Sequence, residues 1–262
     1  MSHVVFDSDR LAEATNVLNH LRQVSPVDGW FTETYCRKSR YFTPENGARI
    51  EGIRHAIDQL DLDDELRCVA LTSLMEAADR VDSTVGVQMA YLKKWAPRAL
   101  QPLRLRDPEP LPRSPHGKAE VHRLEAREAA ATLEADVAYL DPPYNQHPYG
   151  SNYFMLNLLC EYKPPADISN VSGIPVDWNR SRYNQRKNAE DALFEVIENC
   201  NAKFVLISYN SEGFITPQCF LDRLGALGKV TMLETPYNTF RGSRNLRQRA
   251  IHVTEFLYLL KK

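Results

Sequence analysis

The first hundred residues carry apolar side chains at the spacing of amphipathic helices. Residues 9–21 form one such segment. A second segment begins at Thr43, whose hydroxyl can cap a helix, with Pro44 in the first turn and apolar residues at helical spacing after it. A third runs over residues 64–82, where leucine, valine and alanine form one stripe. This pattern predicts a mainly helical amino-terminal half.

The pattern changes after residues 107–118, which hold four prolines, a glycine and several charges and therefore predict an exposed linker. Beyond the linker, short apolar runs alternate with helical stretches, and we expect strands at residues 119–124, 135–140, 203–209, 230–234 and 253–260. Strand, helix and strand in repetition predict an α/β fold with a parallel sheet and right-handed crossovers. The last two runs have no helix between them, so we expect them to form an antiparallel pair at one edge of the sheet.

Composition narrows the class of protein. The chain has 262 residues with 43% hydrophobic and 25% charged side chains, which is typical of a globular protein with one substantial core or two modest ones. No stretch approaches the roughly 20 apolar residues that cross a bilayer, and the start lacks a secretory signal, so we expect a cytoplasmic protein without membrane contact. The five cysteines are scattered and never spaced C-x-x-C, so we expect neither a disulfide framework nor a metal site.

The predicted strand that ends at Leu140 leads directly into Asp141-Pro142-Pro143-Tyr144. In an open parallel sheet, ligands bind outside the carboxyl ends of the strands, so residues at this position are candidates for binding. Two prolines turn the chain abruptly out of the sheet and present their carbonyl oxygens outward. Asp141 and the Pro142 carbonyl can then accept the two hydrogens of an exocyclic amine while Tyr144 stacks on its ring. The alternative interpretation is a tight turn built from common loop residues.

Together with Asp141–Tyr144, several further segments resemble one family of enzymes. They are residues 145–149, 152–154, 208–210, 212–213 and 237–242 in the carboxyl-terminal half and residues 40–47, 78–81 and 90–95 upstream. The chain is similar to the D12-class, Dam-like adenine-specific DNA methyltransferases of restriction-modification systems. The resemblance implies methyl transfer from S-adenosylmethionine to the exocyclic amine of adenine in double-stranded DNA. It also implies a Rossmann-like methyltransferase sheet and a mainly helical target-recognition domain.

The resemblance assigns the target base to Asp141–Tyr144. Adenine hides its amine in base pairing, so such an enzyme must extrude the base and hold it by stacking and by contacts to its edge. Tyr144 would stack on one side of the base, and Tyr149 or Tyr153 on the other. Acceptors at Asp141 and Pro142 would localise the lone pair of the amine toward the methyl donor, and alignment of the reactants is worth about 7–11 kcal/mol.

Three acids are the cofactor-binding residues that the resemblance implies. Glu125 directly follows residues 119–124, where these enzymes have an acid near the adenine of the cofactor. Asp7, with Asp9 close by, follows an early apolar run and would hold the cofactor ribose, and Asp141 would also border the cofactor. For Glu125 the alternative is a first-turn acid favoured by the helix dipole. For Asp7 the alternative is a solvated helix cap.

The largest departure from the family is the lack of a glycine-rich turn, roughly Phe-x-Gly-x-Gly, after a first strand. Such a turn lets the cofactor approach bare backbone, but the first glycine of this chain is Gly29. One hypothesis is therefore a split enzyme whose first strand is supplied by a second chain. Another is a non-catalytic DNA-binding subunit or remnant. A third keeps the enzyme but moves the methyl group to cytosine or to a protein glutamine.

These interpretations divide the chain into four parts. Residues 1–25 would be a remnant of the amino-terminal methyltransferase part, and residues 26–106 would form the helical region for target recognition and DNA binding. Residues 107–118 would be the linker. Residues 119–262 would form the catalytic methyltransferase domain, with its first strand missing.

Local clusters of basic residues are candidates for DNA contacts, because the net charge of −2 argues against a general polyanion binder. Residues 86–106 contain five basic residues and no acid, and the loop between the last two predicted strands is rich in arginine. Such residues suit phosphate contacts, which position a protein on DNA without reading its sequence. The alternative is an ordinary solvated surface. The candidates are Lys93, Lys94, Arg241, Arg244, Arg247 and Arg249.

Overall fold

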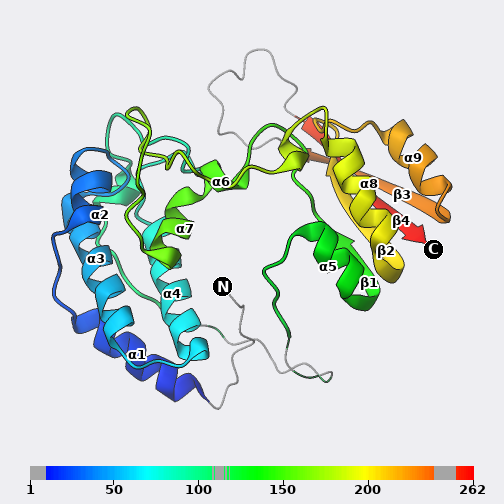
Figure 1. The fold of residues 1–262 in the computed structure, drawn as a ribbon. Helices are drawn as coiled ribbons and strands as arrows, with labels where there is room; N and C mark the ends of the chain where they lie inside the picture. The colour runs from blue at the N-terminus through cyan, green and yellow to red at the C-terminus, as the bar shows by residue number, and fades with distance from the viewer. Residues whose placement is uncertain (1–9, 108, 110–114, 116, 118, 239–251) are drawn as a thin grey trace. The chain divides into compact units, whose positions relative to one another are not determined.

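The chain forms two compact units in the computed structural model, which describes residues 10–107, 109, 115, 117, 119–238 and 252–262 (Figure 1). The helical unit comprises the residues up to 123 together with residues 151–178. The sheet unit comprises residues 124–150 and 179–262. The chain thus leaves the helical unit, enters the sheet unit, returns and leaves again.

The helical unit is built from helices of very different lengths around one apolar core. Its largest buried side chains come from several of these elements and include Phe31, Tyr35, Tyr41 and Phe42. The elements are α1 (Leu11–Gln23), α2 (Trp30–Thr32), a π-helical turn η2 (Glu33–Arg37), α3 (Pro44–Gln59), α4 (Asp64–Asp79), a 3₁₀ turn η3 (Pro97–Leu100) and α7 (Phe154–Glu161). The short helix α6 (Tyr149–Asn152) lies where the chain passes from the sheet unit into the helical unit.

The helices begin largely where their capping residues predict. The Thr43 hydroxyl accepts a hydrogen bond from the Asn46 amide at 3.3 Å, and Pro44 occupies the first turn of α3. Asp63 caps α4 in the same way. The predicted helix at residues 9–21 is confirmed as α1, which starts at Leu11, although Asp9 lies outside the described residues. Local capping chemistry therefore locates the starts of α3 and α4, whereas Arg10 before α1 makes no side-chain capping hydrogen bond.

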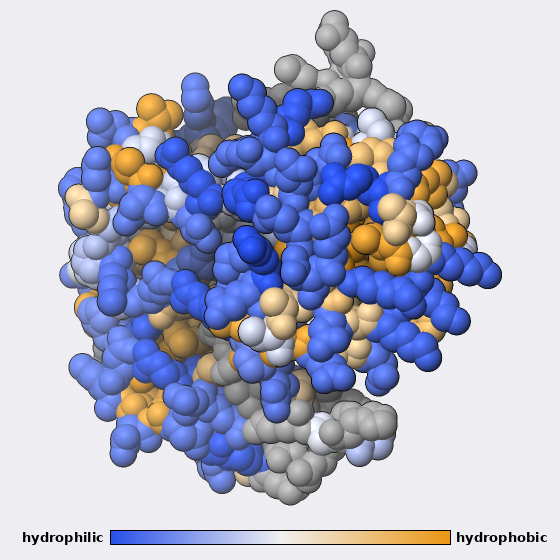
Figure 2. Space-filling model, turned by 45° about the vertical axis from the view of Figure 1, so that its right-hand side comes forward, coloured by the Kyte–Doolittle hydropathy of each residue, from blue (hydrophilic) through white to orange (hydrophobic). Residues whose placement is uncertain are grey.

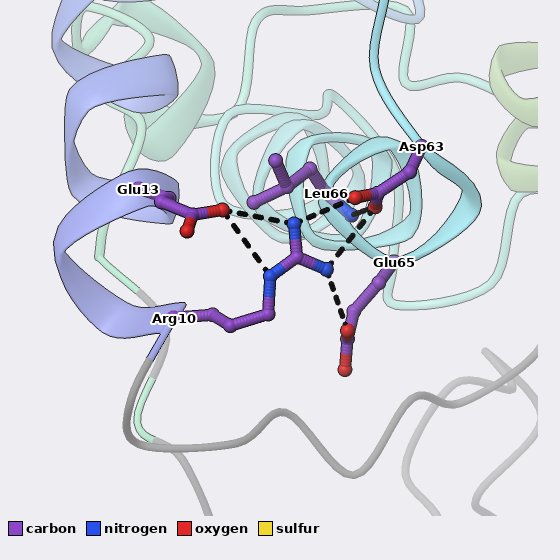
Figure 3. A network of polar contacts seen from close by, with 5 residues as sticks. All are labelled: Arg10, Glu13, Asp63, Glu65 and Leu66. Atoms are coloured by element: carbon purple, nitrogen blue, oxygen red, sulfur yellow. Dashed lines mark hydrogen bonds and ion pairs between the residues drawn. The ribbon is translucent and has the colours of Figure 1, made fainter.

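One half-buried arginine, Arg10, joins the starts of α1 and α4 (Figure 3). The Arg10 guanidinium lies 2.9 Å from a Glu13 carboxylate oxygen, and its other contacts are with Asp63 and Glu65, each at 2.6 Å. The ion pair with Arg10 is the main reason that the pKa of Asp63 falls to about 2. This network fixes the relative position of two helices that are distant in sequence.

The helix α7 completes the helical core from a distant part of the sequence. Phe154, Met155 and Leu159 are buried in that core, and the buried Arg54 of α3 donates to the Leu159 carbonyl at 2.7 Å. Residues 151–178 therefore belong to the helical unit, whereas the predicted catalytic domain included them. Residues 1–25 were predicted to be a remnant of the methyltransferase part. The structure differs, because α1 packs in the core of the helical unit.

The sheet unit has a mixed four-stranded sheet, which confirms the α/β prediction for the carboxyl-terminal half (Figure 1). The strand order is β1-β2-β4-β3; β1 and β2 are parallel, and β4 is antiparallel to both of its neighbours. The predicted antiparallel pair is thus confirmed as β3 and β4. The elements are α5 (Ala126–Thr132), β1 (Glu134–Leu140), a 3₁₀ turn η4 (Arg182–Asn184), α8 (Ala189–Asn199), β2 (Asn201–Asn210), α9 (Pro217–Gly225), β3 (Lys229–Asn238) and β4 (His252–Lys261).

The strand predicted at residues 119–124 is wrong. These residues have no regular secondary structure, and Val121 and Leu124 are exposed. An alternating pattern specifies a strand only when a neighbouring strand accepts its backbone hydrogen bonds, and no described strand of the sheet pairs with this segment. β1 is consequently the first strand of the sheet and forms one of its edges.

The core of the sheet unit lies between the strands and two helices. Phe194 of α8 and Phe220 of α9 pack against the strands, and the Phe220 ring stacks on Tyr258 of β4 with 4.4 Å between the centroids. Hydrophilic side chains cover much of the visible surface of the molecule, but apolar side chains gather between them (Figure 2). None of the helices in the described part of the chain combines the length and hydropathy needed to span a membrane.

Candidate functional site

The topology brings three strand ends to one edge of the sheet. β1 and β2 are parallel, and β3 runs in the same direction because β4 is antiparallel to both β2 and β3. The residues that follow β1 and β2 at this edge are Asp141 and Ser211, and β3 ends and β4 begins there, at Asn238 and His252. We call this end of the sheet the carboxyl edge. In open sheets with parallel strands, this is the edge where ligands bind.

Asp141–Tyr144 lies at the carboxyl edge as an irregular turn after β1. Asp141 is exposed, and the two prolines and Tyr144 are half-buried. The carbonyl oxygen of Tyr144 accepts hydrogen bonds from the Phe214 amide at 3.0 Å and from the Tyr209 hydroxyl at 3.5 Å. These bonds fasten the turn after β1 to the turn after β2. The turn is therefore held in one conformation while its carboxylate remains open to solvent.

The Tyr144 side chain combines an accessible ring with a neutral hydroxyl. Its ring meets that of Tyr209 edge to face, with 6.2 Å between centroids. Burial raises the pKa of Tyr144, and the nearby carboxylates of Glu255 and Glu212 raise it further. The phenol therefore stays protonated at neutral pH, and the site offers an uncharged aromatic surface beside the Asp141 carboxylate. That combination suits a planar, hydrogen-bonding ring.

The turn after β2 is closed by its own polar contacts. The Asn210 side-chain oxygen accepts from the Glu212 amide at 2.8 Å, and the Asn210 amide group donates to Glu255 of β4. Gly213 lies against the Tyr209 ring, where a Cβ atom would clash. Only glycine lets the chain pass so close to the ring. This packing holds Tyr209, and through it the turn that carries Tyr144.

Glu255 is a site residue that the sequence analysis missed. It lies on β4 opposite Asn210, with one carboxylate oxygen bonded to the Asn210 amide. Its charge contributes to the raised pKa of Tyr144. The signal was present in the sequence as a lone acid inside the apolar run at residues 253–260. A single charge in a strand that is otherwise apolar indicates either a strand end or a polar partner.

The two tyrosines predicted to stack on the base lie in different units. Tyr149 is exposed at the start of α6 and belongs to the sheet unit, as Tyr144 does. Tyr153 precedes α7 and belongs to the helical unit. Tyr149 is close enough to Tyr144 to influence its pKa. Of the two candidates, Tyr149 is therefore the one found beside Tyr144 within a single unit.

The two cofactor candidates that the structure describes, Glu125 and Asp141, do not form a common cofactor-binding site. Glu125 is exposed, and its carboxylate accepts the Arg127 amide at 2.8 Å as the cap of α5. This geometry matches the alternative interpretation of Glu125 as a helix-start acid. Asp7 lies outside the described residues. Asp141 is the one cofactor candidate that the structure brings to the carboxyl edge.

The structure describes two of the six basic candidates. Lys93 and Lys94 are exposed in the helical unit, where Arg40 donates to the Lys93 carbonyl and lies over the Trp95 ring at 5.9 Å. The other four candidates, Arg241, Arg244, Arg247 and Arg249, lie outside the described residues. Their segment nevertheless starts and ends at the carboxyl edge, because it joins β3 to β4.

Two further basic residues lie near the carboxyl edge and were not predicted. Arg186 and Lys187 are exposed, and the Arg186 guanidinium lies 4.9 Å from the centre of the Phe214 ring, in the turn after β2. The sequence signal was a group of four basic residues within positions 180–187, a stretch without acids. Within the described parts of the chain, His, Cys, Asp and Glu side chains form no cluster of three or more that could hold a metal ion.

Comparison with known proteins gives one family and several relatives. Residues 4–217 match the model of the D12 class N6 adenine-specific DNA methyltransferases. The chain is 28% identical to the type II methyltransferase M.NlaIII of Neisseria lactamica, over 96% of this chain and 77% of the relative. It is 31% identical to the type II methyltransferase M.CviAII of Paramecium bursaria Chlorella virus 1, over 89% of this chain and 71% of the relative. It is also 29% identical to M.FokI of Planomicrobium okeanokoites, over 85% of this chain and 35% of the relative. No solved structure matches the chain significantly.

Proposed function

Because the chain belongs to the D12 class N6 adenine-specific DNA methyltransferase family, its reaction is adenine methylation in DNA, and we propose that the carboxyl edge holds the target adenine. The donor of the methyl group is S-adenosylmethionine, which methyltransferases of this kind use. The relatives named as type II methyltransferases support a modification role in a restriction-modification system, with double-stranded DNA as the substrate.

One observation carries the assignment of the site. The Tyr144 carbonyl oxygen accepts hydrogen bonds from the Phe214 amide and the Tyr209 hydroxyl, so one fixed turn at a strand end carries an exposed carboxylate and a half-buried aromatic ring. A flexible turn would have to lose conformational entropy on binding a base. Here that ordering is already present before the base arrives, which favours binding of a small planar group.

The chemistry follows from what this site can do to an adenine amine. Asp141 and the carbonyl of Pro142 accept the two amine hydrogens, which turns the nitrogen lone pair away from the ring and toward the methyl donor. Tyr144 stacks on the extruded base, with Tyr149 on the same unit available for the second side. S-adenosylmethionine supplies the methyl group when bound. The residues of this chain thus act by holding and orienting the base.

A second candidate function is a non-catalytic DNA-binding subunit. It is favoured by the lack of a cofactor cradle among the described residues, since Glu125 is engaged in capping α5. In this case the chain would bind DNA and the extruded base but would not retain S-adenosylmethionine. Calorimetric titration of this chain with S-adenosylmethionine separates the two candidates. Binding favours the methyltransferase, and its absence favours the subunit.

The assignment of Asp141 is tested by substitution. We expect Asp141→Ala to lower transfer of labelled methyl groups to duplex DNA by at least about 100-fold, because the amine loses its main acceptor. Retention of DNA should change little. Asp222→Ala, which removes another exposed carboxylate of the sheet unit, should leave methyl transfer unchanged. Full activity in Asp141→Ala would disprove the role of this residue.

A further inference from the structure

A tight turn with two basic residues lies directly before α8, near the carboxyl edge. We call residues 185–188 the basic turn. The Gln185 carbonyl oxygen accepts a hydrogen bond from the Asn188 amide at 2.8 Å, and the Asn188 side chain donates to that of Gln185 at 2.6 Å. Arg186 and Lys187 are the two central residues, and both are exposed. The backbone of the basic turn is thus held in one conformation, and it presents two cations to solvent.

The segment that carries the basic turn contacts both strand-end turns of the candidate site. Asn184 precedes the basic turn, and its side-chain amide donates to the Asn145 carbonyl, directly after Tyr144, at 2.7 Å. The Arg186 guanidinium lies 4.9 Å from the centre of the Phe214 ring. The amide of the same Phe214 donates to the Tyr144 carbonyl oxygen. Two separate contacts therefore fix the basic turn beside the turn that carries Tyr144.

The cations of the basic turn are not neutralised by acids of their own segment. A cation–π contact leaves the N–H groups of a guanidinium available to an oxyanion. Among the described residues, no carboxylate forms an ion pair with Arg186 or Lys187, whereas Arg182 lies 3.1 Å from Glu195. Within one short segment, Arg182 is therefore paired and Arg186 is available.

The acids at the start of α8 have a different partner. Glu190 and Asp191 lie in the first turn of α8, close to the basic turn in sequence. The guanidinium of Arg223, on α9, lies 3.2 Å from the Glu190 carboxylate and 3.9 Å from that of Asp191. These two acids are thus compensated by α9, and the charge of the basic turn is left for a ligand.

The surroundings of the candidate base site are acidic. Besides burial, the carboxylates of Glu255, Glu212 and Asp141 raise the pKa of Tyr144. An extruded base stays linked to its own sugar and phosphate, so a base beside Tyr144 brings a phosphate group to this acidic edge. Like charges repel at such short range, and a fixed cation is needed to hold the phosphate there.

We propose that Arg186 binds the phosphate group of the extruded adenine nucleotide itself. Phe214 acts as a positioning residue, because its ring lies under the guanidinium while its amide holds the Tyr144 carbonyl. The phosphate and the base of one nucleotide are then held by two connected turns. The inference rests on the proposed function, since it requires that the carboxyl edge holds the base. It adds a contact that orients the nucleotide without reading the identity of the base.

The probe for this contact is a DNA duplex with one unpaired adenine, which offers an extruded base without the cost of opening a base pair. In two further duplexes, the phosphate on one or the other side of this adenine is replaced by a neutral methylphosphonate. For the unaltered chain, we expect one of the two replacements to weaken binding by about tenfold, because a charge-assisted contact is lost. Arg186→Ala should bind the unmodified duplex about tenfold less tightly and show no further loss with that methylphosphonate.

Two further variants separate this contact from a general effect of charge or packing. Arg182→Ala is the matched control, because it removes the same charge from the same segment at a residue already paired with Glu195. It should bind all three duplexes as the unaltered chain does. Phe214→Leu removes the ring but keeps the amide that bonds to Tyr144. It should reduce the effect of the methylphosphonate to about threefold, whereas a purely structural role of Phe214 would weaken binding to all three duplexes equally.

Two results would overturn the proposal. One is that the losses caused by Arg186→Ala and by the methylphosphonate add at both positions. The other is that neither methylphosphonate weakens binding of the unaltered chain. Failure of the proposed base site would appear separately, as equal affinity for duplexes with an unpaired adenine and with an unpaired thymine, whatever the effect of the methylphosphonates.

Discussion

The helical unit and the sheet unit bury their apolar side chains in different ways. In the helical unit, aromatic residues such as Tyr35 and Tyr41 are completely buried, and their hydroxyls reach backbone carbonyls more than 40 residues away in sequence. In the sheet unit, burial alternates along β2 and β4, where Ile207, Tyr258 and Leu260 are completely buried and the side chains between them are half-buried. The comparison shows that the helices of one unit surround a common core, whereas the described helices of the sheet unit bury one face of the sheet and leave Tyr139 and Leu233 of the other face 60% and 59% exposed.

The largest effect is expected at the centre of the helical unit. Glu51 is fully buried and accepts the amides of Gly29, Phe31 and Thr32 together with the Thr32 hydroxyl. Although burial opposes ionisation, these bonds lower the pKa of Glu51, so it is charged at neutral pH. Glu51→Ala leaves these donors without a partner and should lower the free energy of unfolding by about 3–5 kcal/mol.

Tryptophan fluorescence during urea unfolding measures this loss, because Trp30, Trp95 and Trp178 all lie in the helical unit. Glu45→Ala, at an exposed position on the same helix, should change the stability by less than about 0.5 kcal/mol. If both substitutions had equally small effects, the stability of the helical unit would not depend on the buried contacts of Glu51. The difference in burial between the two units would then have no consequence for stability at this position.

The second prediction compares the two faces of the sheet directly. Ile207 is fully buried on the face that α8 and α9 cover, so Ile207→Ala should destabilise the sheet unit by about 2–5 kcal/mol. Tyr139 lies on the opposite face and is 60% exposed, so Tyr139→Ala should lower the stability by less than about 0.5 kcal/mol. Hydrogen exchange of the β2 amides reports on both. Similar losses of stability for the two variants would contradict the difference in burial between the two faces of the sheet.

The sequence predicted local features well and long-range neighbours poorly. Thr43 and Asp63 act on amides three residues away, so the starts of α3 and α4 follow from local chemistry. The position of Asp141 at a strand end followed from the apolar run before it. The strand at residues 119–124 failed because a strand needs a partner, which a local pattern does not specify.

Domain membership could not be read from position along the chain for the same reason. Phe154 and Met155 follow Asp141–Tyr144 closely in sequence but fill the core of the helical unit. Glu255 was not predicted to be a site residue because its hydrogen-bond partner, Asn210, lies 45 residues earlier in the sequence. In each case the missing information was which segments meet in space, and that depends on the whole core.

The smallest effects are expected at the surface, where each unit has an exposed basic pair that we expect to contact DNA phosphates. Lys93→Ala with Lys94→Ala removes the pair of the helical unit, and Arg186→Ala with Lys187→Ala removes that of the sheet unit. Each double variant should bind duplex DNA less tightly and reduce the slope of log affinity against log salt by about 2, or one per lost phosphate contact.

The control for both pairs is Lys203→Ala, because Lys203 is exposed near the start of β2, at the opposite end of the sheet from the carboxyl edge. Its salt slope should equal that of the unaltered chain. An unchanged slope in one of the double variants would remove that unit from the DNA interface and leave binding to the other unit alone.

The hairpin of β3 and β4 has a consequence for how such a protein can diversify. The two strands pair over ten residues, from Lys229 with Lys261 to Asn238 with His252, so their register is set inside the sheet. The arginine-bearing connection between them can therefore gain or lose residues over evolutionary time without shifting any strand. The arginines that we predict to contact the DNA backbone and the turn Asp141–Tyr144 that we propose to hold the base are in separate stretches of sequence, so each can change while the other is preserved.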